Sequence, residues 1–218
     1  MNRPLLALPL AAVVALAGCA GAAPGASEPT APAATEATRP ACPTAEPAPL
    51  PAGETRIVTI ETSLGAIEIT VDGALSPIAA GNFVALAACG YYDGVVFHRV
   101  VPGFVIQGGD GQYGRDPADP AVVGTGGPGY TITDEPVTAT YGRGTVAMAR
   151  TAAPNSQGSQ FFIVLTEEAR APLESYNTYA IFGTVTKGLD TVDAVAAAAD
   201  QEIPSEPIVM DRVTVATP

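Results

Sequence analysis

The chain has 218 residues, enough for one folded domain and a tail, and its 22 acidic and 10 basic side chains give a formal net charge of −12. A surface this negative repels phosphate backbones, so the composition argues against nucleic acid as a partner. A single histidine and three scattered cysteines argue against a metal site and against a Ser-His-Asp hydrolase.

The start of the chain has the outline of a secretion signal. Arg3 precedes an apolar stretch, 5–17, that is too short to span a bilayer comfortably. It closes in Leu16-Ala17-Gly18-Cys19, which resembles the bacterial lipoprotein box. That resemblance implies a signal peptide at 1–18, a lipid on Cys19, and an extracytoplasmic protein anchored to a bacterial membrane. An ordinary signal peptide with an incidental cysteine is the alternative.

The next segment has the composition of a tether. Residues 20–52 contain eight prolines among Ala, Thr, Gly and Glu, without a hydrophobic period of 2 or 3.6. Such a segment cannot bury enough apolar surface to offset its ordering entropy. We therefore expect the lipidated cysteine and a disordered linker at 19–52, followed by a domain at 53–218.

From Arg56 onward the pattern becomes that of short strands. Apolar and polar residues alternate on either side of Ser63-Leu64-Gly65, which predicts a hairpin. Ser76-Pro77, a capping hydroxyl before a proline, predicts the start of a helix, and Gly90 predicts its end. Further strands are expected at 96–101, 104–108, 130–133, 145–149, 160–165, 180–186 and 208–215, and a second helix at 191–199. Many short strands with two helices favour a closed antiparallel barrel.

Two cysteines remain once Cys19 is assigned to the lipid. Cys42 lies in the tether and Cys89 at the expected end of the first helix. Export would place both where a disulfide can persist, and a bridge would hold the tether against the domain. The alternative is a buried Cys89 that acts as a small apolar residue, with Cys42 free or paired elsewhere.

Six motifs in one order carry a family resemblance. The most informative are FHRVVPGFVIQGGD at 97–110 and NSQGSQFFIVL at 155–165, and the others are GYYDG at 90–94, GTGGPGYTITDEP at 124–136, GTVAMART at 144–151 and YAIFGTV at 179–185. From about residue 56 to 215 the chain resembles the cyclophilins, a family of peptidyl-prolyl cis-trans isomerases. The resemblance implies an all-β fold, a closed eight-stranded antiparallel barrel capped by two α-helices.

The resemblance also implies an activity, which is to accelerate X-Pro isomerisation in exported, folding proteins. Proline-containing segments would be the partners, and the protein would act as a monomer without a cofactor or metal. A site of this kind must bind the twisted amide better than either planar form. By resemblance, Arg99 donates to the proline nitrogen, and Gln107 bonds the substrate carbonyl and positions Arg99. The alternative is a low-turnover proline-peptide-binding module or chaperone on the same fold.

The substrate pocket is assigned by the same carry-over. Its residues are Phe104, Val105, Phe162 and Leu173 around the proline ring, with Ala149, Arg150, Gln160 and Tyr179 beside them. The glycine-rich loop 126–129 matches the edge of a neighbouring subsite, or is a mobile turn. His98 is one residue from Arg99 and should face the other side of a strand, as a satisfied core histidine. The family often has a tryptophan near Pro172, but this chain contains none.

Overall fold

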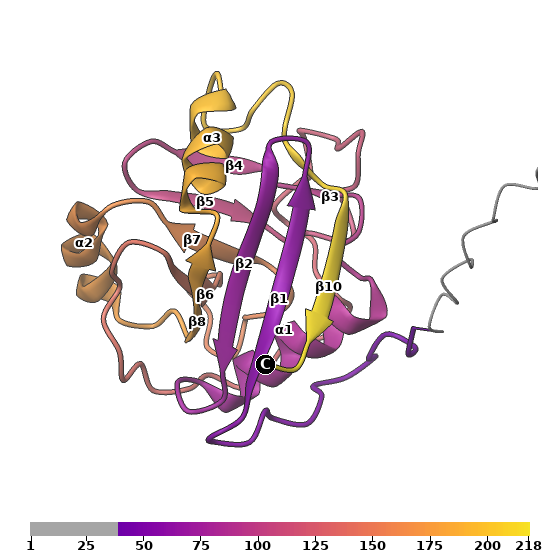
Figure 1. The fold of residues 1–218 in the computed structure, drawn as a ribbon, viewed down its shortest axis with the longest axis vertical. Coiled ribbons are helices and arrows are strands. Elements are labelled where there is room, and N and C mark those ends of the chain that lie inside the picture. Colours follow the sequence, from indigo (N-terminus) through magenta and orange to yellow (C-terminus); the bar gives the residue numbers. More distant parts are fainter. Residues whose placement is uncertain (1–38) are drawn as a thin grey trace, which may run out of the picture. The chain divides into compact units, whose positions relative to one another are not determined.

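The computed structural model describes residues 39–218 (Figure 1). The expected signal peptide, Cys19 and the first part of the linker lie outside these residues. Between residues 39 and 218, no helix has both the length and the apolar character needed to cross a membrane.

The described part of the chain is mainly β. Its strands are β1 (Thr55–Thr62), β2 (Gly65–Asp72), β3 (Val95–Val96), β4 (Arg99–Val101), β5 (Val105–Gly108), β6 (Thr145–Met148), β7 (Phe161–Val164), β8 (Ile181–Lys187), β9 (Val209–Met210) and β10 (Arg212–Ala216). Its helices are α1 (Pro77–Cys89), α2 (Arg170–Tyr176) and α3 (Leu189–Ala198), and a 3-10 turn, η1 (Glu167–Ala169), precedes α2.

Eight strands form one antiparallel sheet, which curls into a half-barrel. Their order is β10-β1-β2-β8-β6-β7-β5-β4, and β3 and β9 pair separately. Within residues 39–218, no ladder joins the edge strands β4 and β10. One edge group of β4, the N–H of Val100, instead donates to the carbonyl of Glu202 in a loop, at 2.8 Å. The expected closed barrel is therefore open along one seam, because a loop occupies part of that edge.

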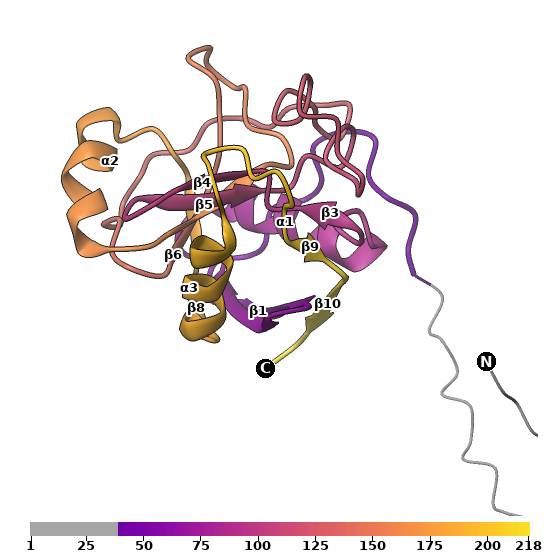
Figure 2. The same cartoon turned by 90° about the horizontal axis from the view of Figure 1, so that it is seen from above.

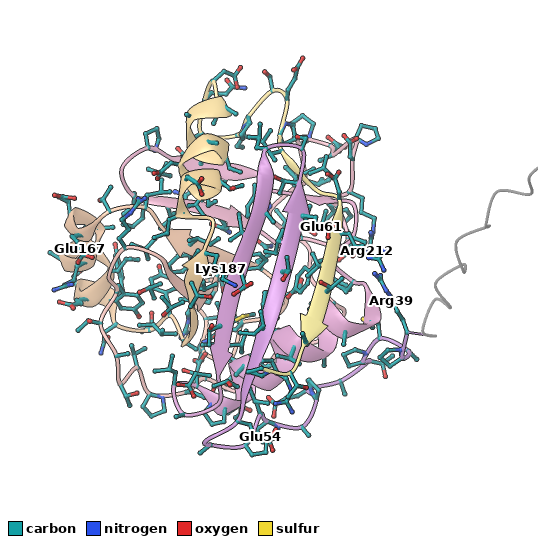
Figure 3. All side chains as sticks on the ribbon, in the orientation of Figure 1. Arg39, Glu54, Glu61, Glu167, Lys187 and Arg212 are labelled. Carbon is teal, nitrogen blue, oxygen red and sulfur yellow. A yellow bond between two sulfur atoms is a disulfide. The ribbon has the colours of Figure 1, made fainter. Side chains whose placement is uncertain are left out.

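The β1–β2 hairpin has the predicted alternation. Ile60 lies opposite Ile67 in the ladder, and both are fully buried in the core. On the outer face, Glu61 of β1 lies opposite Arg212 of β10, and Figure 3 shows the two side chains close together there. The pattern thus directs apolar side chains to the core and complementary charges to the surface.

Helix α1 lies toward one end of the β1–β2 hairpin and α3 toward the other (Figure 1). The core side of α1 buries Phe83 and Leu86 completely, and Gly90 ends the helix with φ of 79°, as predicted. Helix α3 occupies 189–198, close to the expected 191–199. Both helices form at the positions that the sequence predicts.

The predicted cap of α1 is wrong. The hydroxyl of Ser76 makes no capping bond and is buried without a partner among residues 39–218. The carboxylate of Glu135 instead accepts hydrogen bonds from the N–H groups of Ile78 and Ala79, both at 2.9 Å. A carboxylate is favoured at the positive end of a helix, and here it comes from a distant loop.

Two further elements differ from expectation. The third helix, α2, was not expected. Pro172 lies in its first turn, where the missing N–H is tolerated, and Asn177 ends it with φ of 44°. In Figures 1 and 2, α2 projects at one side of the molecule, away from α1. The expected strand at 130–133 is reduced to one bridge, between Ile132 and Gln157.

Residues 39–52 run beside α1, although we expected them in the disordered linker (Figure 1). Cys42 and Cys89 form a disulfide, with a sulfur–sulfur distance of 2.07 Å. Leu50 is only 6% exposed, joins the core, and donates its N–H to the carbonyl of Pro77 at 2.9 Å. The ordered region therefore begins well before residue 53, because one covalent bond and one buried leucine hold the segment in place.

Candidate active site

A pocket of about 450 Å³ lies where β4, β5, β7 and α2 approach one another, and we call it the Arg99 pocket. It is lined by Arg99, Phe104, Val105, Gln107, Ala149, Arg150, Phe162, Pro172, Leu173, Tyr176 and Tyr179. Nine of the ten residues predicted for catalysis and substrate binding are among them. The tenth, Gln160, lines an adjoining cavity of about 670 Å³ together with the loop 124–129, which we call the glycine-loop cavity.

Arg99 and Gln107 are paired across the β4–β5 ladder, which places their side chains on one face. Arg99 Nη1 approaches Gln107 Oε1 at 3.5 Å, and Arg99 Nε donates to Glu202 Oε1 at 2.7 Å. The Arg99 side chain is 36% exposed, so its guanidinium is accessible from the pocket. Because arginine is permanently charged, the strand pair presents a cation next to an apolar cavity.

A second glutamine holds Gln107. The amide Nε2 of Gln107 donates to Gln160 Oε1 at 3.0 Å. Gln160 in turn donates to the carbonyls of Gly124 and Gly126 at 2.9 and 2.8 Å. With its amide donor engaged, Gln107 directs its oxygen toward Arg99. Gln160, which we assigned to substrate, thus connects the Arg99 pocket to the glycine loop.

The glycine loop is organised by Asp110, a residue that the sequence reasoning missed. Asp110 is fully buried, and its carboxylate accepts backbone N–H groups of Gln112, Tyr113, Gly124 and Gly126 at 2.8–3.1 Å. A β-carbon on Gly126 would lie 2.3 Å from this carboxylate, so only glycine permits the approach. The sequence signal that could have indicated this role is the Asp directly after two glycines in QGGD.

The apolar wall of the Arg99 pocket comes from several elements. Phe162, Leu173 and Val105 are each at most 4% exposed. The ring of Tyr179 meets that of Phe162 edge to face, with centroids 5.4 Å apart. Tyr176, which we did not assign to the site, stands at the rim with a large exposed area. Tyr176 lies on α2, a helix that we did not expect, and so no local sequence pattern indicated that this residue belongs to the site.

Arg150 lines both cavities, but its side chain is engaged within the protein. It forms an ion pair with Asp134 at 3.0 Å and donates to the carbonyls of Ala153 and Thr178 at 2.7 and 3.3 Å. The side chain is only 10% exposed. The structure thus gives Arg150 a part in fixing the loop around residue 153, beside any contact with substrate.

His98 lies outside the Arg99 pocket, as expected from its position beside Arg99. It is 4% exposed, and burial lowers the pKa of its imidazole from the usual 6.5. Neither ring nitrogen has a hydrogen-bond partner among residues 39–218. The histidine is buried as predicted but is not satisfied by protein groups. It lines a separate hollow, and Glu202 is another of the residues that line it.

The family model described as cyclophilin type peptidyl-prolyl cis-trans isomerase/CLD matches residues 57–215. Among curated proteins, the chain is 34% identical to peptidyl-prolyl cis-trans isomerase A of Dickeya dadantii, over 72% of this chain and 83% of that protein. It is 36% identical to a probable peptidyl-prolyl cis-trans isomerase A of Mycobacterium leprae, over 72% of this chain and 90% of that protein.

Solved structures give the same result for the fold. A cyclophilin type peptidyl-prolyl cis-trans isomerase of Cryptosporidium parvum matches with a TM-score of 0.62 and 30% identity, over 75% of this chain and 99% of that one. A second crystal structure of that protein, in the presence of the dipeptide Ala-Pro, matches with a TM-score of 0.61, 30% identity and coverage of 74% and 99%. The matched family, the sequence relatives and the fold agree, and this chain belongs to the cyclophilin-type peptidyl-prolyl cis-trans isomerases.

Proposed function

We propose that this isomerase acts on X-Pro bonds of exported proteins while they fold, with Arg99 and Gln107 as its catalytic pair. The observation that carries the proposal is their arrangement. A permanent cation and an amide lie opposite each other on two strands, and both line a pocket with buried apolar walls. The crystal structure of the Cryptosporidium parvum relative with Ala-Pro supports a proline-containing ligand.

The chemistry requires only that the amide twist. Its C–N bond has partial double-bond character, and the barrier to rotation is about 18–20 kcal/mol. In the twisted form the proline nitrogen becomes pyramidal and regains a lone pair. A donor from Arg99 stabilises that lone pair more than the planar amide, which lowers the barrier. No bond breaks, and the proton stays on the guanidinium.

The remaining groups fix the substrate. The proline ring packs against Phe162 and Leu173, which are buried and apolar. Nε2 of Gln107 carries a second N–H besides the one donated to Gln160, and this N–H donates to the substrate carbonyl, so that the rotating bond is held beside the guanidinium of Arg99. The glycine-loop cavity, which shares Gln107 and Ala149 with the Arg99 pocket, receives a neighbouring residue of the same peptide.

We place the enzyme at a membrane on the basis of the lipoprotein box at 16–19. Two acyl chains on Cys19 would give a stable membrane anchor, whereas a single chain is marginal. The disulfide joins Cys42 to Cys89 in the domain, so roughly 20 residues lie between the proposed lipid on Cys19 and the first residue that is bonded covalently to the domain. In an extended polyproline form such a segment reaches about 70 Å. The enzyme would then act on proteins emerging at the membrane surface.

A protease-coupled assay with an Xaa-Pro peptide tests the catalytic proposal. Arg99→Ala should lower kcat/KM by about 100-fold or more, the effect of losing one preorganised donor. Arg99→Lys should not restore activity, because the planar fork is lost. Arg212→Ala, on the outer face of β10, is the matched control (Figure 3). An unchanged rate in folded Arg99→Ala would exclude this mechanism, and binding without turnover in the wild type would support the binding-module alternative.

A further inference from the structure

Arg99 has a second contact that the catalytic proposal does not use. Its Nε donates to Oε1 of Glu202 at 2.7 Å, a shorter bond than the 3.5 Å contact from Nη1 to Gln107. Glu202 is the only acidic side chain in ion-pair contact with Arg99 within residues 39–218. It lies in the loop 199–208 between α3 and β9, far from Arg99 in the sequence.

The loop that carries Glu202 is held close to Arg99 by backbone bonds. Val100, the neighbour of Arg99, donates its N–H to the carbonyl of Glu202 at 2.8 Å. Phe97 donates to the carbonyl of Ile208 at 2.9 Å, at the other end of the loop. Figure 2 shows this yellow segment passing beside β4. The carboxylate therefore reaches Arg99 from a backbone that is bonded to the same strand.

The loop also closes on itself. The carboxylate of Asp200 accepts the backbone N–H of Ser205 at 3.0 Å and its hydroxyl at 2.6 Å. These two bonds join the ends of a short turn, with Glu202 between them. Glu206, on the same loop, forms no ion pair among the described residues. The loop thus presents one carboxylate to Arg99 and leaves another without a basic partner, which provides a matched comparison.

A bond to Nε has a specific effect on an arginine. The guanidinium is planar, and fixing Nε sets the direction of both terminal nitrogens. Here it leaves Nη1 on the side of Gln107, facing the pocket. An unrestrained arginine would lose rotamer freedom when it engages the twisted amide. A guanidinium oriented beforehand avoids that loss, as other preorganised catalytic donors do.

From this geometry we propose that Glu202 is a positioning residue for catalysis, which orients the Arg99 guanidinium before substrate binds. The inference rests on the proposed role of Arg99. The pair is partly exposed, with 36% of the Arg99 side chain and 61% of the Glu202 side chain accessible. Its coupling should therefore be modest, about threefold to fivefold in kcat/KM, and weaker at high salt.

The test compares Glu202→Ala and Glu202→Gln with the control Glu206→Ala in the full mature protein. Glu202→Ala should lower kcat about threefold to fivefold with little change in KM, and Glu202→Gln less, because its amide oxygen still accepts from Nε. The difference between Glu202→Ala and wild type should shrink in 1 M salt. In an Arg99→Lys background, Glu202→Ala should have no further effect.

An NMR measurement separates positioning from general stability. The Nε–Hε signal of Arg99, identified by its loss in Arg99→Lys, should exchange slowly with water in wild type and fast in Glu202→Ala. Equal kcat in Glu202→Ala and Glu206→Ala, or a higher kcat, would overturn the positioning role. If Arg99→Ala itself retained full activity, the catalytic assignment would fail instead, so the two failures are distinguishable.

Discussion

Glu135 accepts a hydrogen bond at 2.9 Å from the backbone N–H of Ile78, which lies 57 residues earlier in the chain. Its other carboxylate oxygen accepts the N–H of Ala79, also at 2.9 Å. Pro77 has no N–H, and Ala80 donates to the carbonyl of Ser76 at 2.8 Å. Every backbone N–H in the first turn of α1 thus has an acceptor, and for two of these N–H groups the acceptor is the side chain of Glu135 from a distant loop.

Glu135→Ala should therefore destabilise the protein by about 1–2 kcal/mol, because two helix N–H groups lose a charged partner. Ser76→Ala is the matched comparison. Its hydroxyl is buried without a partner among the described residues, so its loss should be close to neutral. Urea unfolding of both variants measures the effect. A larger loss in Ser76→Ala than in Glu135→Ala would show that the serine, and not the glutamate, supports the helix.

The disulfide should contribute to stability without affecting turnover. It closes a loop between residues 47 apart in sequence, which corresponds to as much as about 4 kcal/mol by loop entropy. Neither cysteine lines the Arg99 pocket. The double change Cys42→Ser/Cys89→Ser should lower the urea midpoint and leave kcat/KM unchanged. Reductant should lower the urea midpoint of the wild type only. An equal shift in the double variant would show that the stabilisation does not come from the disulfide.

Asp110→Asn should loosen the glycine loop. Each carboxylate oxygen of Asp110 accepts two backbone N–H groups, and an amide NH₂ would face donors in either orientation. We expect a loss of about 2–4 kcal/mol and a raised KM, because Gly124 and Gly126 line the adjoining cavity. Asp119→Asn, an exposed position on the same segment, is the control. Unchanged stability of Asp110→Asn would contradict the organising role.

His98 should make stability depend on pH. Burial lowers the pKa of its imidazole, so the unfolded chain binds a proton that the folded protein excludes. The contribution of His98 to the free energy of unfolding should fall as the pH decreases through about 6.5, and level off below the lowered pKa of the imidazole. The chain has one histidine, so the drop in Tm from about pH 7.5 to about pH 5.5 should be smaller in His98→Asn. If the Tm of wild type and of His98→Asn fell in parallel with pH, carboxylates alone would account for the loss of stability.

The anchor proposal predicts a change in phase behaviour. Expressed with its signal, the wild-type protein should partition into detergent, because two acyl chains give stable insertion. Cys19→Ala should remove the lipid and move the protein to the aqueous phase, with the Cys42–Cys89 bridge and isomerase activity retained. Mass spectrometry of the N-terminal peptide identifies the modification. A wild-type protein found wholly in the aqueous phase would exclude lipid anchoring.

Local patterns were sufficient for most of the elements. The alternation around Ile60 and Ile67 predicted the first hairpin, since a period of two decides which face is buried. Pro77 and Gly90 predicted the bounds of α1 because each acts on its own backbone. The motifs at 97–110 and 155–165 placed Arg99 and Gln107 in one pocket through their family resemblance, which composition alone would not have done.

Other features depend on contacts between distant parts of the chain, which a local pattern does not contain. Ser76 is a residue type that commonly caps helices, yet the N–H groups at the start of α1 bond to Glu135. The loop that carries Glu135 reaches this N-terminus. The proline-rich residues 39–52 are ordered by Cys42 and Leu50, which find partners in the domain. Glu202 meets Arg99 only because backbone bonds attach its loop to β4. Sequence determined the elements and the chemical groups, whereas tertiary packing decided which groups meet, since burial and hydrogen bonding depend on distance in space.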